Sequence, residues 1–314
     1  MLERRSVGST ETANVWFSEN TSDARALLEE RGVHPLEPIV LESEEAVGRA
    51  MLSELERVAT EKAAQAGPDA PVNIALLGGR GAQALHRLLG ARLLDNPMDP
   101  LIGRLVVFTQ DALAPLPMAS PLSFVRDFER LLGAAFFRKV RSFEPFETES
   151  LSAEESTLRS LTALKEAGGL DLFFVGHGPE ADAASHLAYI KPGSGARIND
   201  WAGAMPISST ILEHHINKFK AGGSLVTPED EARCRAARYV LTLGPAAIVN
   251  AKRIVQSVVD ASSAPAKKRS YRRVMETRLS DDVPQRARQL DENPGLWVRV
   301  HGDVRSYVLS DVLE

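Results

Sequence analysis

The sequence predicts an α/β protein: a mainly parallel, doubly wound, Rossmann-like sheet with helices on both faces. Three observations support this fold class. Short apolar runs alternate with helical patterns along most of the 314 residues. Several of these runs are apolar throughout, which is typical of parallel strands buried on both faces. The runs end in loops that contain glycine and acidic residues, and open α/β sheets carry their ligand sites in such loops.

The composition is that of a soluble globular protein, with 44% hydrophobic and 25% charged residues. The 37 basic and 42 acidic side chains give a net charge of −5, which argues against nucleic-acid binding through general basic charge. The single cysteine, Cys234, excludes an intramolecular disulfide and fits a reducing compartment. No apolar stretch approaches the roughly 20 residues that span a bilayer, and the N-terminus lacks the apolar core of a signal peptide. We therefore expect a cytoplasmic protein with no nucleic-acid or membrane partner.

Residues 1–42 are polar and irregular in pattern, with weak helical character from Ala24 to Arg31. We interpret them as an N-terminal extension and assign residues 43–314 to a single α/β domain, although the length would also allow two domains. The sequence shows no internal repeat and no low-complexity tract.

The first half of the domain begins with a helix that Ser43 caps, with apolar residues at helical spacing as far as Val58. A strand over residues 72–77 and a helix over 82–93 follow. Residues 105–108 form the next strand. Ser120, with Pro121 in the first helical position, opens a helix to about Phe137.

The second half continues the alternation. A capping box at Ser152 opens a helix that stops at Gly168-Gly169, and the apolar run 170–175 forms a strand. A helix follows Gly244-Pro245. The remaining expected strands cover residues 239–243, 254–259 and 296–300. The basic residues from Lys267 to Arg273 are interpreted as the solvated face of a helix.

A glycine-rich turn, Gly78-Gly79-Arg80-Gly81, lies between a predicted strand and a predicted helix. Glycines let the backbone approach an anion closely, and free amides at a helix start favour negative charge. Arg80 adds a side chain that can grip a phosphate at two points. A tight turn that merely requires glycine explains the same residues, because neither a Walker loop nor a full dinucleotide fingerprint is present.

Acidic residues follow two other strands. Asp111 comes after the strand at 105–108 and would act as a general base if it is desolvated; an aspartate that caps a loop is the simpler explanation. His177, Glu180 and Asp182 crowd the loop after 170–175, where two neighbouring acids can divide acid and base roles. The alternative is a polar loop whose acids cap the following helix.

Arg238 precedes a strand, where it would reach a phosphate or a sugar hydroxyl, or form a surface ion pair of little consequence. We predict no metal site, because the adjacent His214 and His215 point apart on a helix and no His-Glu-x-x-His pattern occurs. No cofactor is predicted.

Taken in order, these segments make residues 43–310 resemble the glucosamine-6-phosphate isomerase/deaminase and 6-phosphogluconolactonase family. The family's phosphate loop corresponds to residues 78–81. The aspartate that serves the deaminases as proton-transfer base corresponds to Asp111, and Arg238 stands where they carry a phosphate-binding lysine. Three further motifs, a Ser-Phe pair, a Gly-x-Gly-x-Asp-Gly-His loop and a Leu-Thr-x-Gly strand end, match residues 123–124, 176–182 and 241–244.

The sequence departs from the family at positions that carry chemistry. The hydroxyl residues of the phosphate loop are replaced, and Ala112 stands in place of the glutamate that follows the family's aspartate. Glu180 stands where the family has aspartate. The loop histidine that assists ring opening in deaminases is replaced by Asp182, and its glutamate partner falls at Leu187.

Three hypotheses follow. In the first, the chain is a working sugar-phosphate isomerase, deaminase or lactonase in which Asp111 moves a proton and the loop acids assist ring opening or activate water. In the second it binds a phosphorylated sugar without turnover, and in the third it binds a protein partner through the N-terminal extension. We prefer the first, because unpaired carboxylates follow two strand ends. Homo-oligomer formation remains open in all three.

The candidate catalytic residues are Asp111, His177, Glu180 and Asp182, and the candidate phosphate-binding residues are Gly78, Gly79, Arg80, Gly81 and Arg238. The preferred hypothesis requires Arg80, Asp111 and Glu180 to converge at one edge of the sheet.

Overall fold

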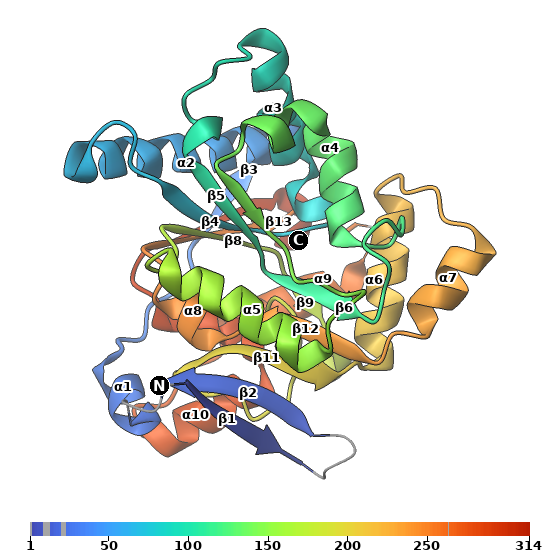
Figure 1. The fold of residues 1–314 in the computed structure, drawn as a ribbon. Coiled ribbons are helices and arrows are strands. Elements are labelled where there is room, and N and C mark those ends of the chain that lie inside the picture. Colours follow the sequence, from blue (N-terminus) through green and yellow to red (C-terminus); the bar gives the residue numbers. More distant parts are fainter. Residues whose placement is uncertain (1, 9–12, 20–22, 263) are drawn as a thin grey trace.

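The protein is built on a seven-stranded parallel sheet (Figure 1). The computed structural model describes residues 2–8, 13–19, 23–262 and 264–314. The strand order is β3-β14-β13-β8-β4-β5-β7, and every neighbouring pair is parallel. The strands are β3 (Pro38–Leu41), β4 (Val72–Leu76), β5 (Leu105–Thr109), β7 (Ser142–Glu144), β8 (Leu172–Val175), β13 (Arg253–Val258) and β14 (Val304–Leu309). The predicted fold class is confirmed.

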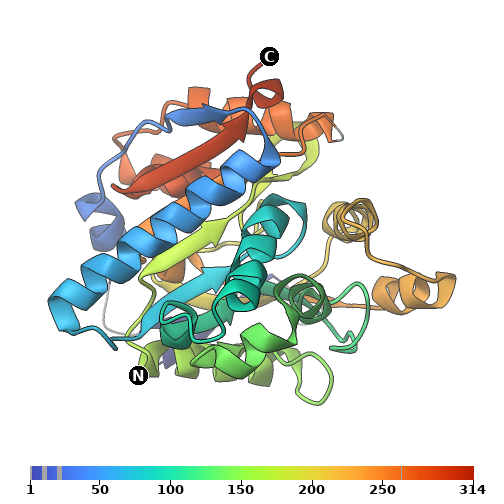
Figure 2. The same cartoon turned by 90° about the horizontal axis from the view of Figure 1, so that it is seen from above.

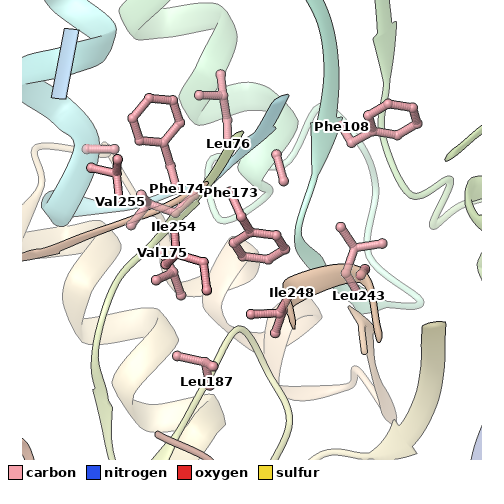
Figure 3. Packing of buried hydrophobic residues seen from close by; sticks show 14 of the residues in the cluster. Leu76, Phe108, Phe173, Phe174, Val175, Leu187, Leu243, Ile248, Ile254 and Val255 are labelled. Carbon is pink, nitrogen blue, oxygen red and sulfur yellow. The ribbon is translucent and has the colours of Figure 1, made fainter. Parts of the chain in front are cut away.

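The central strands are apolar on both faces because both faces are covered. All four residues of β8 are fully buried. Figure 3 shows Phe173 and Phe174 pointing to opposite sides of this strand, with Phe173 directed toward Ile248 and Leu187. Burying each of these rings removes enough apolar surface to stabilise the fold by about 1.5–3 kcal/mol.

Helices lie on both sides of this sheet. On one side α2 (Glu44–Ala66), α3 (Gln83–Asp95) and α4 (Phe124–Lys139) pack in sequence, and Figure 2 shows the blue helix α2 beside the red strand β14. On the other side α5 (Ala153–Glu166) and α8 (Pro245–Val249) lie between β8 and a second sheet (Figure 1). The remaining helices are α1 (Ala24–Glu30), α6 (Ser209–Ala221), α7 (Pro228–Arg235), α9 (Pro265–Glu276) and α10 (Val283–Glu292).

The second sheet is antiparallel and was not predicted. Its order is β1-β2-β11-β12-β6. Its strands are β1 (Leu2–Val7), β2 (Asn14–Glu19), β6 (Asp111–Ala114), β11 (Asp200–Pro206) and β12 (Tyr239–Leu243). A two-stranded hairpin, β9 (Gly178–Pro179) with β10 (Ser185–His186), stands apart from both sheets.

The expectation of an irregular N-terminal segment was wrong. β1, β2 and β3 all belong to the sheets, and the segment is packed rather than loose because Trp16 on β2 is fully buried. The Trp16 indole donates a hydrogen bond to the backbone oxygen of Ser194 at 3.0 Å. The division of the chain at residue 42 stays a prediction.

Two local predictions also failed. Residues 294–300 form a 3₁₀ helix instead of a strand, and the last strand is β14. A short buried apolar run does not by its pattern distinguish strand from helix. α4 begins at Phe124, because Ser123 caps it by accepting from Val125 N at 3.2 Å, while Ser120 lies in the preceding turn. The caps at Ser43 and Ser152 are confirmed.

Within the described part of the chain, none of the helices combines the length and the apolar character needed to cross a bilayer.

His86 on α3 is an ionisable side chain placed in the apolar core. It is fully buried and meets the Phe128 ring edge-on, with 5.1 Å between ring centroids. Neither ring nitrogen has a hydrogen-bond partner among the described residues. Burial, reinforced by the positive charges of Arg87 and Arg130, lowers the pKa of His86 to about 3. The unfolded chain therefore takes up a proton here more readily than the folded protein does.

We expect His86→Leu to raise the free energy of unfolding at pH 7 by about 1 kcal/mol, because it removes two unpaired polar atoms from the core. A lowered folded-state pKa contributes stability above the unfolded value, near 6.5, that is lost as the pH falls toward 3. The variant should therefore lose less stability on acidification, measured by urea unfolding from pH 7 to pH 4. His34→Leu, at an exposed histidine, is the control. Equal acid sensitivity of His86→Leu and wild type would contradict this account.

Candidate active site

A cavity opens where four neighbouring parallel strands end. The empty space within and in front of it is about 530 Å³, which includes open solvent. Each strand contributes through the residues that follow it: Gly78 and Arg80 after β4, Asp111 after β5, His177 after β8 and Asp260 after β13. Further lining residues come from α4, α6, α9 and the β9–β10 hairpin, among them Phe124, Lys218, Lys267 and His186. This is the edge of the sheet at which the sequence predicts a site.

Contacts within the protein determine the conformation of the glycine turn at residues 78–81. A Cβ on Gly78 would lie 1.8 Å from the Phe124 ring, so only glycine fits there. Gly79 has φ 77°, and its N–H donates to the Asp127 carboxylate at 3.3 Å. The Gly81 oxygen accepts from the Ser257 hydroxyl at 2.7 Å. The amide of Gly79, which was expected to bind phosphate, thus already has a partner within the protein.

Arg80 lines the cavity and is part of an ion pair. Its guanidinium lies 2.6 Å from the Glu44 carboxylate on α2, with both side chains half-buried. The hydrogen bond to Glu44 raises the pKa of Arg80. Arg80 therefore contributes a positive charge that Glu44 partly balances.

Asp111 is buried at the start of β6, where the chain passes from the parallel sheet to the antiparallel one. Among the described residues, no hydrogen bond or ion pair is formed by its carboxylate. Burial raises the pKa of Asp111 to about 7, and the positive charge of Lys218 works in the opposite direction. A carboxylate with this pKa can both accept and return a proton near neutral pH.

Lys218 on α6, which was not predicted from the sequence, lines the same cavity as Asp111, and each of the two charges shifts the pKa of the other group. Its ammonium lies over the rings of Phe124 and Tyr189, 4.8 and 5.2 Å from the ring centroids. Such cation–π contacts hold a cation without neutralising it. Burial lowers the pKa of Lys218, while the negative charge of Asp111 raises it. No ion pair is formed by Lys218 among the described residues.

A histidine–carboxylate pair spans the β9–β10 hairpin. His186 Nδ1 lies 2.9 Å from Glu180 Oε1, and both side chains are almost fully buried. Because an ionised carboxylate only accepts hydrogen bonds, Nδ1–H is the donor and Nε2 is left as an acceptor. His186 lines the cavity and Glu180 lies behind it. Burial lowers the pKa of His186, and the bond to Glu180 opposes this shift.

His177, which follows β8, and Lys267, on α9, line the side of the cavity next to α9. His177 Nε2 lies 2.7 Å from the Ser270 hydroxyl, which itself donates to the Lys267 backbone oxygen at 3.1 Å. His177 thus donates to Ser270, and burial lowers its pKa to about 3. Lys267 was expected in solvent, but it is buried and its ammonium lies 2.6 and 2.8 Å from the two Asp260 carboxylate oxygens.

The structure brings some of the predicted site residues together, while Gly79, Asp182 and Arg238 do not line the cavity. Arg80, Asp111 and His177 line one cavity, and Glu180 reaches it through His186. Asp182 is exposed at the tip of the hairpin. Arg238 is exposed just before the start of β12. Asp111 pairs with Thr242, near the other end of that strand, so Arg238 lies away from Asp111.

No group of three or more histidine, cysteine or acidic side chains suited to a metal ion occurs in the residues that the structure describes. His215, for example, is bound to the Tyr189 hydroxyl and the Leu122 backbone oxygen, at 2.6 and 2.7 Å, while its neighbour His214 lines the cavity.

Gly178→Ala should displace His186. A Cβ on Gly178 would lie 1.7 Å from His186 Nε2, so the ring must leave its place against Glu180. We expect a loss of about 1–3 kcal/mol of stability and a changed imidazole signal for His186 in ¹⁵N NMR spectra. Gly176→Ala is the matched control, since its Cβ would meet only the end of the Leu77 side chain at 3.1 Å. Identical His186 signals in both variants would show that the ring is not packed on Gly178.

Comparisons with known proteins agree on the architecture. No protein-family model matches the chain, and no curated protein matches its sequence. A solved monomeric glucosamine-6-phosphate deaminase of the NagB superfamily matches with a TM-score of 0.63 and 15% identity, over 88% of this chain and 98% of that one. The 6-phosphogluconolactonase from Trypanosoma cruzi matches with a TM-score of 0.60 and 14% identity, over 90% and 97%. That from Shewanella baltica gives 0.60 and 15%, over 89% and 100%. As the resemblance predicted, this chain has the fold of glucosamine-6-phosphate deaminase and 6-phosphogluconolactonase.

Proposed function

We propose that the protein is an enzyme that acts on a phosphorylated sugar by acid–base chemistry, of the glucosamine-6-phosphate deaminase or 6-phosphogluconolactonase type. One observation carries the proposal: three groups that line the same cavity lack a partner among the described residues, namely the buried Asp111 carboxylate, the acceptor nitrogen of His186 and the Lys218 ammonium, which has no carboxylate beside it. Structural ion-pair networks also shift side-chain pKa values, but Asp111 and Lys218 form no ion pair among the described residues.

Lys218 is the residue best suited to hold the phosphate. Its charge is not balanced by an ion pair among the described residues, and its aromatic contacts hold the ammonium toward the cavity. Arg80 and Lys267 add positive charge that Glu44 and Asp260 partly balance. A dianionic phosphate would therefore be attracted mainly to Lys218, with Arg80 as the second contact.

Asp111 is the candidate for proton transfer at carbon. Its burial removes water that would compete for the carboxylate, and its raised pKa makes it a stronger base than an exposed aspartate. In an isomerisation it would take a proton from one carbon and deliver it to the neighbouring carbon.

His186 is the candidate for the second proton transfer. Its Nε2 can take a proton from water or a hydroxyl group while Glu180 stabilises the imidazolium that forms. This would activate water toward a lactone, or assist the opening of an amino-sugar ring. The His–carboxylate pair that the sequence lacked at positions 182 and 187 is thus supplied in the opposite order, with the acid before the histidine.

Binding without turnover is the second candidate function. The glycine turn favours it, because the Gly79 amide is bonded to Asp127 and Arg80 is paired with Glu44, which weakens the expected phosphate grip. Sugar-phosphate binding by the wild type without turnover, and insensitive to Asp111→Asn, would support this function over catalysis.

Asp111→Asn should lower kcat by about 100-fold or more, because general-base groups contribute roughly 10²–10⁴-fold. The measurements are ammonia release from glucosamine-6-phosphate and hydrolysis of 6-phosphogluconolactone. In the wild type, kcat/KM should rise with pH through about 7, since the deprotonated carboxylate is the active form. Asp182→Asn, an exposed acid of the neighbouring loop, is the control. A wild type inert toward both substrates would refute the proposal.

Lys218→Met should weaken binding of the sugar phosphate about ten- to a hundredfold, because a charged hydrogen bond is lost while the apolar stem is kept. Isothermal titration calorimetry with the sugar phosphate, in competition with inorganic phosphate, measures this directly. Arg238→Met removes one positive charge outside the cavity and should leave affinity within about twofold. Similar losses in both variants would indicate that only net charge matters.

A further inference from the structure

The Glu180–His186 pair depends on the geometry of one short hairpin. Glu180 and His186 lie on either side of its tip, the single 3₁₀ turn at Ala181–Ala183. The tip closes on itself, because Glu180 N donates to Ala184 O at 2.8 Å and Ala184 N donates to Ala181 O at 2.9 Å. A change in the tip therefore changes the distance between the carboxylate and the imidazole.

The tip holds two successive residues in the left-handed region. Asp182 has φ 54° and Ala183 has φ 61°. Aspartate tolerates this region, but alanine rarely adopts it because its Cβ clashes with the backbone. Such residues persist where surrounding contacts impose the conformation, and they cluster at functional sites.

Strand β10 and the tip of the hairpin are anchored separately. On β10, Asn293 Oδ1 accepts from the amide and hydroxyl of Ser185 at 2.9 and 2.6 Å. At the tip, Arg273 on α9 donates from Nη1 to the Asp182 backbone oxygen at 2.5 Å. Among the described residues, this is the single hydrogen bond that reaches 181–183 from outside the hairpin. α9 also packs against this turn.

We propose that Arg273 is a positioning residue that holds the strained hairpin tip and so keeps Glu180 bonded to His186. The inference rests on the proposed function of His186 as an acid–base group and extends it to a residue outside the cavity. Arg273 touches neither the cavity nor the pair itself. Its effect passes through the backbone of Asp182.

The neighbouring residue Arg272 allows the positioning role of Arg273 to be distinguished from a general effect of positive charge. Arg272 is also exposed on α9, but its guanidinium donates to the backbone oxygen of Leu313, near the C-terminus, at 3.1 Å. Arg272→Ala and Arg273→Ala therefore remove the same charge from the same helix, and only the second releases the hairpin.

The experiment compares these two variants with wild type. Arg273→Ala should lower kcat roughly five- to tenfold with KM unchanged, and should change the ¹⁵N signals of the His186 ring. Arg272→Ala should change neither. Adding Ala183→Gly to Arg273→Ala should restore most of kcat and the wild-type His186 signals, because glycine adopts the left-handed conformation without strain.

Three outcomes would overturn the proposal: equal behaviour of the two arginine variants, a KM effect without a kcat effect, or no rescue by Ala183→Gly. The NMR measurement does not depend on turnover. If the wild type acts on no sugar phosphate, the proposed function fails, while an altered His186 signal in Arg273→Ala alone would still support the positioning role.

Discussion

The parallel pairing of β13 with β8, β8 with β4, and β4 with β5 is the constraint on which the candidate site depends. Strands that run in the same direction leave the sheet at one edge, so the loops after them meet although they lie far apart in the sequence. Gly78, Asp111, His177 and Asp260 share a cavity for this reason. Each loop taken alone has an ordinary structural explanation. Their convergence makes a functional interpretation stronger than any single motif allows.

The charged side chains that line the cavity differ in whether they have an ion-pair partner. Arg80 is paired with Glu44 and Lys267 with Asp260, so the positive charges of Arg80 and Lys267 are partly balanced. Asp111 and Lys218 are left without ion pairs among the described residues. Keeping a buried acid and a half-buried base without such partners costs free energy. A ligand with an anionic end and exchangeable protons would provide a partner for both groups.

The parallel sheet could be predicted from the sequence, whereas the antiparallel sheet could not. β8 is read correctly because continuous apolar residues and flanking breakers leave few alternatives. β1 and β2 were missed because β1 is mostly polar and β2 contains only three consecutive apolar residues. The burial of Trp16 comes from pairing with β11, a distant strand. The same limit applies to the site. Asp111 could be found from its place after a strand, whereas Lys218 lies within a helix, and nothing local indicates that it lines the same cavity as Asp111. His186 was overlooked because its significance comes from Glu180 across a hairpin that the sequence pattern does not reveal.

A crystal structure of the protein soaked with a stable sugar phosphate such as 6-phosphogluconate would show whether the cavity binds the ligand as we propose. We expect the phosphate beside Lys218 and Arg80, and the carbon chain between Asp111 and the His186 ring. Density for the ligand on another face of the molecule, or an empty cavity at a saturating ligand concentration, would contradict this expectation.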